Sequence, residues 1–387
     1  MSWRSIVRGA GRVFALIGLL EFLSAQVRCP TTKEFSHIGM DRAFPSARFI
    51  PDTLWVPVVF HLIAQDSGGW LEERRIAAQV RALNRDFAAA GIQFYLPRYG
   101  PQGQPTCGVT RHLSPLAVHD WTFQEDTLKS LVCWPPDSFL NIWVVDEMVL
   151  STIGYARVLG DSEGTPGVVL IKSVVGDKVG VQPPFDWGRT AVHEIGHVFS
   201  LYHPFEGGCV GMNAQTCAIE GDEICDTPPQ SQPHYGCPPL TTNTCHEAPP
   251  DLFDPVDNFM GYVDDECMTR FTSLQIQRMR EFLFQVGAVL ISEENQQARG
   301  RNEPFLSGCA AVASLSYSLP SFHIRQAGHS IFMEAEESIS LILLDAMGRM
   351  ILKKEGNQFF LSNLPVGLYI AVVEVRGKPL FFRFFVI

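Results

Sequence analysis

The sequence predicts an α+β protein: a mixed, twisted sheet backed by helices, then a loop-rich region held by disulfides, then a small all-β sandwich. Three observations support this fold class. Apolar runs flank an amphipathic segment in the first half, six of the ten cysteines lie from Cys209 to Cys267, and short alternating strands dominate from about Ser314. With 387 residues, the chain is long enough for two or three domains with separate cores.

The N-terminus has the layout of a secretory signal peptide, with Arg4, Arg8 and Arg12 ahead of an apolar run that ends in small residues at Ala25. That run is too short to cross a bilayer as a stable helix, so we expect no membrane span after the signal is removed. The formal net charge of −11 argues against nucleic acid as a partner.

Apolar runs in the first half predict one helix and several strands. The helix is expected over residues 71–91, because its apolar residues recur on one face and Gly91 is a typical helix end. The strands are expected at residues 53–64, 91–96, 139–147 and 165–175.

The second half begins with a histidine-rich helix that starts near Trp187. Residues 204–258 then lack periodicity and predict loops. A further helix is expected over residues 272–285, where Thr272 and Gln275 have the spacing of a capping box.

The stretch HEIGHVFSLYH places three histidines where they can bind one metal ion. His193 and His197 are four residues apart, so on a helix they point the same way. His203 can join them only if the helix ends after Ser200 and the chain turns back. Zinc prefers neutral imidazole ligands, and Glu194 is placed to take a proton from a zinc-bound water. The alternative is a surface helix with incidental histidines.

HEIGHVFSLYH resembles the zinc motif of the metzincins, and NFMGYVDDECMTRFT supplies the methionine-containing turn that lies beneath the metal in that clan. With QVRALNRDF, FLNIWV and GDEICDTPP, these stretches span roughly residues 55–285 and resemble the pappalysin family, the ulilysin- and cytophagalysin-like secreted zinc proteases. The resemblance implies a metzincin-like zincin fold with an active-site helix and a disulfide-rich lower subdomain.

The resemblance also implies roles for single residues. Glu194 is the implied general base, Met260 the implied floor of the site, and Tyr262 the implied oxyanion stabiliser. The alternative for Met260 and Tyr262 is ordinary core packing. The family has glycine where this chain has Ser200, and a serine in the left-handed conformation costs about 1–2 kcal/mol. We expect that strain to be tolerated; the alternative is a misplaced His203. The implied zinc ligands are His193, His197 and His203.

Relatives in the family bind calcium near the acidic stretch GDEICDTPP. Hard cations such as calcium favour several oxygen ligands. The candidate calcium ligands are Asp222, Asp226 and Thr227. The alternative is a solvated acidic loop.

Ten cysteines fit an exported chain, because an oxidising compartment lets them pair. Cys29, in VRCPTTKEF, resembles a cysteine that caps zinc in latent relatives, and the alternative is a Cys29–Cys309 bridge. Spacing alone does not assign the other pairs. The pairs expected are Cys209–Cys237 and Cys245–Cys267 from the resemblance, and Cys217–Cys225 and Cys107–Cys133 as further candidates.

Residues 314–387 resemble the C-terminal sorting domain of type IX secretion. The matching features are Asp345, Gly348 and Arg349 on the first hairpin, then LPVGLYI, then Arg383 in the last strand. The resemblance implies export through the periplasm by the type IX machinery, with release or attachment at the cell surface. The alternative is an accessory β-sandwich.

Together these features predict a secreted zinc metalloendopeptidase that acts on protein or peptide substrates aligned antiparallel to an edge strand. One alternative is a non-catalytic, zinc-containing cell-surface adhesion or binding protein, which Ser200 favours. Another is a zinc hydrolase of non-peptide amides. The expected domains are a signal peptide at 1–25, a candidate pro-segment at 26–53, a catalytic domain at 54–290, a linker at 291–313 and the β-sandwich at 314–387.

Overall fold

The computed structural model describes residues 53–211, 215–246, 251–303 and 309, and the strands of a C-terminal sheet at 322–327, 330–345, 350–361, 367–375 and 378–386. The predicted signal peptide, Cys29 and nearly all of the candidate pro-segment lie outside the described residues, as do Gly348 and Arg349. Among the residues described, no helix is both long enough and apolar enough to cross a membrane.

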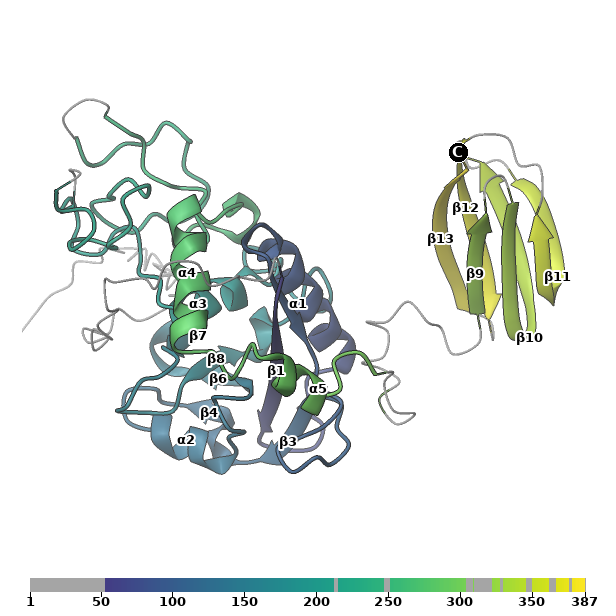
Figure 1. The fold of residues 1–387 in the computed structure, drawn as a ribbon, viewed down its shortest axis with the longest axis horizontal. Helices are drawn as coiled ribbons and strands as arrows, with labels where there is room; N and C mark the ends of the chain where they lie inside the picture. The colour runs from purple at the N-terminus through teal and green to yellow at the C-terminus, as the bar shows by residue number, and fades with distance from the viewer. Residues whose placement is uncertain are drawn as a thin grey trace, which may run out of the picture.

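Residues 53–303, the N-terminal part, are built on a six-stranded mixed sheet (Figure 1). The strand order is β2-β1-β5-β8-β7, and β3 pairs with the second half of β1. Every pairing is parallel except that of β7 with β8. The strands are β1 Leu54–Ala64, β2 Ile92–Tyr95, β3 Val109–Leu113, β5 Leu140–Val145, β7 Gly154–Arg157 and β8 Gly167–Ile171, with a separate parallel pair, β4 Val118–His119 and β6 Glu147–Met148.

Helices α1 and α3 cover this sheet, and α4 follows the loop-rich region. Helix α4 begins behind the predicted capping box, in which Thr272 and Gln275 bond each other's backbone amides. As predicted, the described residues between 204 and 257 contain no helix and no strand. The helices are α1 Glu73–Asp86, α2 Glu125–Leu131, α3 Arg189–Val198, α4 Ser273–Gln285 and α5 Glu293–Ala298.

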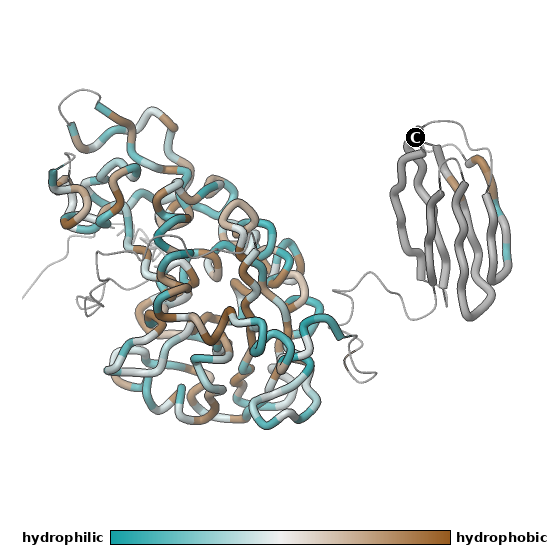
Figure 2. Tube along the Cα trace, viewed as in Figure 1, coloured by the Kyte–Doolittle hydropathy of each residue, from teal (hydrophilic) through white to brown (hydrophobic). Residues whose placement is uncertain are grey.

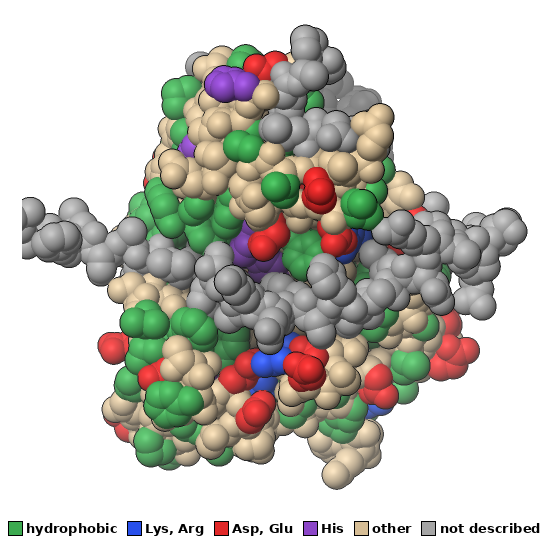
Figure 3. All heavy atoms as spheres, turned by 90° about the vertical axis from the view of Figure 1, so that its left-hand side faces the viewer, with side chains coloured by type: hydrophobic (Ala, Val, Ile, Leu, Met, Phe, Trp, Pro, Cys, Tyr) green, Lys and Arg blue, Asp and Glu red, His purple; other side chains and the backbone are tan. Residues whose placement is uncertain are grey.

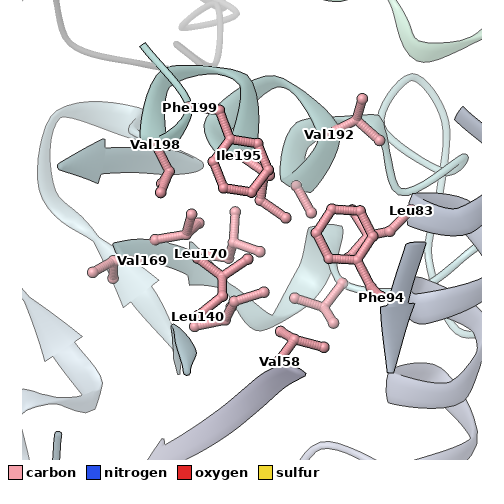
Figure 4. Close-up of a cluster of buried hydrophobic side chains, with 14 of the residues drawn as sticks. Val58, Leu83, Phe94, Leu140, Val169, Leu170, Val192, Ile195, Val198 and Phe199 are labelled. Carbon is pink, nitrogen blue, oxygen red and sulfur yellow. The ribbon is translucent and has the colours of Figure 1, made fainter. Parts of the chain in front are cut away.

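The sheet and its helices share one apolar core (Figure 4). Val58, Leu140 and Leu170 lie on the same face of the sheet, because Val58 pairs with Leu140 and the register carries that face across to β8. Leu83 of α1 and Ile195 of α3 pack onto this face, and all five side chains are buried. In Figure 2 the hydrophobic stretches run mainly through the interior, whereas the outer loops are mostly hydrophilic. This packing fixes α3, the histidine helix, across the sheet.

The composition of residues 291–313 predicts a linker, whereas the structure folds the first part of this segment onto the rest of the N-terminal part. Ser292 caps α5 by accepting from the amide of Asn295. The side chain of Asn295 donates to the carbonyl of Ser138 at 2.9 Å, and Arg299 donates to the carbonyl of Gly100 at 2.6 Å. Asn295 and Arg299 therefore use their polar side chains to bind the rest of the N-terminal part, and this segment is not a solvated linker.

The C-terminal strands form a separate antiparallel sheet, in agreement with the predicted all-β character. The order is β11-β10-β12-β13, and β9 pairs with the first part of β10. The strands are β9 Phe322–Ala327, β10 Ser330–Asp345, β11 Met350–Leu361, β12 Gly367–Val375 and β13 Lys378–Val386.

Candidate active site

Helix α3 carries the first two histidines of the motif. All ten of its residues are buried, so the alternative of a surface helix with incidental histidines is wrong. The Nε2 atoms of His193 and His197 lie 3.1 Å apart. The Nε2 atom of His203 lies 3.0 Å from that of His197 and 3.3 Å from that of His193. The structure therefore brings the three side chains to one point.

Ser200 ends α3 and turns the chain back toward it. Its φ of 71° is left-handed, as expected at the position where the family has glycine. The amide of Leu201 donates to the carbonyl of Gly196 at 3.0 Å. The amide of Ser200 donates to the carbonyl of His197, also at 3.0 Å, which completes a Schellman motif. The turn brings His203 back to the helix, so the alternative of a misplaced third histidine is wrong.

We expect Ser200→Gly to raise the free energy of unfolding by about 1 kcal/mol, because relief of left-handed strain outweighs the added entropy of the unfolded chain. Urea unfolding of the purified protein measures this difference. The control is Ser200→Ala, which keeps a Cβ and should not stabilise the fold. Equal stability of all three proteins would show that the φ at this position carries no strain.

Backbone carbonyls orient two of the imidazole rings. Nδ1 of His193 donates to the carbonyl of Phe259 at 2.9 Å, and Nδ1 of His197 donates to that of Leu201 at 2.7 Å. Because a carbonyl oxygen only accepts, each ring presents the lone pair of Nε2 to the cluster. Burial lowers the pKa of His197 well below its ordinary value and also lowers the pKa of His203, which keeps both rings neutral near pH 7.

This set of donors fits a single metal ion. The Nε2 lone pairs of His193 and His197 face each other and Nε2 of His203, and a cation between the three nitrogens relieves the repulsion. A tetrahedral zinc ion with bonds of about 2.0–2.1 Å separates its nitrogen ligands by about 3.3 Å, close to the 3.0–3.3 Å between these Nε2 atoms. Figure 3 shows histidine side chains in a hollow between the upper and lower parts of this face, with carboxylates nearby.

Glu194 is fully buried and lies against strand β7. A Cβ on Gly154, the first residue of β7, would come within 3.0 Å of Oε1 of Glu194, so glycine leaves room for the carboxylate there. Within the described residues β7 pairs only with β8, which makes it an edge of the sheet. The sequence does not predict β7, because its four residues, GYAR, show no alternation. The glutamate beside the histidines therefore also borders an edge strand.

Met260 packs beneath α3, as the resemblance implies for the methionine turn. It is fully buried, and a Cβ on Gly196 would overlap its sulfur. The amide of Met260 donates to Oδ1 of Asn258 at 2.9 Å, and Asn258 is bonded through its amide nitrogen to Gln275 at 2.8 Å. The sequence does not single out Asn258, which joins the methionine turn to the cap of α4.

Tyr262 lies over two of the histidines. Its ring centroid is 5.0 Å from that of His203 and 5.7 Å from that of His193, and only 4% of the residue is exposed. Phe205 packs on the same tyrosine, with ring centroids 4.9 Å apart. The tyrosine is therefore close enough to the cluster to meet a substrate held there.

Asp265 is a buried residue of the site that sequence reasoning missed. The residue at the N-cap of α3 is Gly188, which has no side chain to cap the helix. Oδ2 of Asp265 accepts instead from the backbone amides of Trp187, at 2.9 Å, and of Arg189, at 3.2 Å. An acceptor 76 residues away in sequence thus performs the capping role. No local sequence pattern signals such a partner.

The three candidate calcium ligands differ in burial. Asp222 and Thr227 are both buried, and burial raises the pKa of Asp222 to about 7, with the amide of Ile224 and the hydroxyl of Thr227 opposing that rise. Oδ2 of Asp222 and Oγ1 of Thr227 are both buried, and the Thr227 hydroxyl interacts with the Asp222 carboxylate. Asp226 is exposed, and its Oδ2 accepts from the amide of Leu274 at 2.9 Å.

The disulfides differ from most of the expected pairs. Cys217–Cys225 is present, but Cys209–Cys237, Cys245–Cys267, Cys107–Cys133 and Cys29–Cys309 are wrong. The loop-rich region folds so that more distant cysteines approach each other, and spacing along the chain does not encode this. Cys133 is free and exposed. The bridges formed are Cys107–Cys309, Cys209–Cys245, Cys217–Cys225 and Cys237–Cys267.

Known proteins match much of this sequence. The model of the pregnancy-associated plasma protein-A family, peptidase family M43, matches residues 126–284. An extracellular metalloprotease of Colletotrichum graminicola is 31% identical over 248 residues, which are 61% of this chain and 78% of that relative. Extracellular metalloprotease 1 of Coccidioides posadasii is 31% identical over 236 residues, which are 58% of this chain and 75% of that relative.

Solved structures show the same fold. Mature mirolysin of Tannerella forsythia, in complex with a cleaved peptide, matches with a TM-score of 0.55 and 28% identity, over 66% of this chain and 99% of mirolysin. The matched family residues include the whole of α3, Met260 and Tyr262. The chain therefore belongs to the pregnancy-associated plasma protein-A family of M43 peptidases and is a secreted metalloendopeptidase.

Proposed function

We propose that the metal is zinc, bound by His193, His197 and His203, and that the protein hydrolyses internal peptide bonds of proteins or peptides. The observation that carries this proposal is the convergence of three histidine Nε2 atoms at 3.0–3.3 Å beside the buried Glu194. When bound, zinc lowers the pKa of a water molecule to about 7 and polarises the scissile carbonyl.

Glu194 acts as the general base. Its carboxylate accepts a proton from the attacking water and passes it to the nitrogen of the leaving amine, so the peptide bond breaks without a free hydroxide. Burial against Gly154 holds the carboxylate in place for both transfers. Tyr262 donates a hydrogen bond from its hydroxyl to the carbonyl oxygen as negative charge develops there.

The edge strand β7 aligns the substrate. Its outer backbone groups can pair with an extended peptide, which then lies antiparallel to β7 and across α3. A bound peptide of this kind places its scissile bond next to Glu194, because that carboxylate touches the first residue of β7. An open edge suits a polymer, whereas a small amide would use none of these backbone groups.

Removal of the metal tests the proposal. We expect a panel of quenched-fluorescence peptides to be cleaved by the mature protein, with activity lost on treatment with a zinc chelator and restored by stoichiometric zinc. Magnesium added in place of zinc is the control, because it favours octahedral oxygen ligands and should restore nothing. Cleavage that persists in fully metal-free protein would overturn the proposal.

The adhesion-protein alternative has no remaining support. Ser200 was the feature that favoured it, and that residue forms the turn that brings His203 back to the cluster.

We propose calcium as a second, structural metal at Asp222 and Thr227. Their buried oxygens suit a hard cation that accepts several oxygen ligands. We expect millimolar calcium to raise the melting temperature of the wild-type protein and to have no effect on Asp222→Asn, measured by differential scanning fluorimetry with zinc held constant. The control is Asp226→Asn, at an exposed carboxylate that should keep the response. If calcium leaves the melting temperature of the wild-type protein unchanged, the site is excluded.

Two further proposals concern the C-terminal sheet and the segment before β1. We propose that the C-terminal sheet serves type IX export, and that the segment before β1 is a removed pro-segment whose Cys29 caps the zinc. Mass spectrometry of the secreted protein tests both, because it identifies the two processed ends. Retention of residues 26–53 or of the C-terminal sheet in the mature active form would overturn the corresponding proposal.

A further inference from the structure

Tyr235 is a half-exposed aromatic residue next to the site. Its ring centroid lies 6.2 Å from that of Tyr262, and the two rings are tilted by 45°. Tyr262 in turn contacts His203 and His193. Tyr235 is 51% exposed, whereas Tyr262 is 4% exposed, so Tyr235 lies between the inner tyrosine and solvent.

The backbone that carries Tyr235 is fixed on both sides. Before it, Nε2 of His234 bonds Oδ2 of the buried Asp254 at 2.7 Å. After it, the carbonyl of Gly236 accepts from the amide of Asp264 at 2.9 Å. The next residue is held by the Cys237–Cys267 disulfide. These contacts hold the backbone that carries the exposed ring. Little conformational entropy of the loop is therefore lost when a ligand binds there.

Tyr235 and β7 border the histidine cluster through different residues. Glu194 lies against Gly154 of β7, whereas His193 and His203 lie against Tyr262, behind Tyr235. Figure 3 shows histidine side chains in the hollow between the upper and lower parts of this face. A peptide that pairs with β7 and crosses the cluster has side chains alternating toward and away from the floor. We expect a side chain on the peptide face that looks toward the tyrosines to reach the exposed face of Tyr235.

We propose that Tyr235 is a specificity-determining residue, whose exposed face binds an apolar or aromatic side chain of the substrate close to the cleaved bond. The inference rests on the proposed peptidase function. Aromatic contacts of this kind contribute about 0.5–1.5 kcal/mol, so truncation of the ring should cost about 2- to 12-fold in discrimination between substrates. The half-exposed ring contributes little to the core, so the fold should survive its removal.

The test compares peptides that differ at single positions around the cut. Each position within three residues of the bond is either phenylalanine or alanine, and kcat and KM are measured separately. In the wild type, one position should favour phenylalanine. Tyr235→Ala should lose that preference through KM, whereas Tyr235→Phe should retain it. The matched control is Leu240→Ala, because Leu240 is 70% exposed in the same disulfide-stapled region and should leave all preferences unchanged.

A second measurement is independent of turnover. The same peptides are titrated against the Glu194→Gln protein with and without Tyr235→Ala, and Kd is read by fluorescence anisotropy. A phenylalanine preference that disappears only with Tyr235→Ala supports the inference, even if the wild type cleaves nothing and the proposed function fails. Unchanged preferences in both assays would overturn it, as would a uniform fall in kcat for every peptide, which would make Tyr235 only a support for Tyr262.

Discussion

Glu194→Gln should abolish turnover while leaving the metal and the fold in place. The substitution keeps the shape of the side chain against Gly154 and removes its ability to accept a proton. General-base catalysis contributes about 10²- to 10⁴-fold, so kcat should fall by that factor or more. The three Nε2 atoms are unchanged, so zinc should remain stoichiometric. The measurements are kcat on a quenched peptide and metal content by atomic emission spectroscopy.

The matched control is Glu220→Gln, at an exposed carboxylate of the same loop-rich region. It should retain wild-type kcat, because it removes one negative charge without touching the site. A Glu194→Gln protein that loses both zinc and activity would make the glutamate a structural support of the metal site. A protein that keeps full activity would place the general base elsewhere.

The motif helix was predictable because its chemistry is local. The four-residue spacing of His193 and His197 fixes a shared helix face, and the third histidine needs only a left-handed turn at Ser200. Residue spacing in one short stretch therefore determines most of the ligand geometry. The general base is adjacent to the first ligand and follows from the same stretch.

The surroundings of the site were not predictable in the same way, because they depend on partners far away in the chain. Strand β7 exists because it pairs with β8, and Gly154 has a role only once Glu194 lies against it. Asp265 caps a helix that begins 76 residues earlier. The disulfides follow the same rule, since Cys107 pairs with a cysteine 202 residues away. Non-local pairings of this kind leave no periodic pattern to detect.

The Cys107–Cys309 bridge should therefore be the largest single covalent contribution to stability. Closing a loop of 202 residues restricts the unfolded chain far more than closing the eight-residue separation of Cys217–Cys225. The double variant Cys107→Ser with Cys309→Ser should lower the free energy of unfolding by about 3–5 kcal/mol. Urea unfolding followed by tryptophan fluorescence measures the difference. Replacing both cysteines leaves neither of them as a free thiol.

Two comparisons separate the effect of the cross-link from that of losing a cysteine. Cys133→Ser removes the free, exposed thiol and should change stability by less than about 0.5 kcal/mol. Removal of both Cys217 and Cys225 opens the shorter loop and should cost about 2–3 kcal/mol in the same entropic account. If removing the long bridge costs no more free energy of unfolding than removing the short one, the contacts of α5 alone hold the C-terminal end of residues 53–303 in place. In that case the hydrogen bonds of Asn295 and Arg299 fix the C-terminal end of this part of the chain. The disulfide then adds little stability to a segment that is already folded.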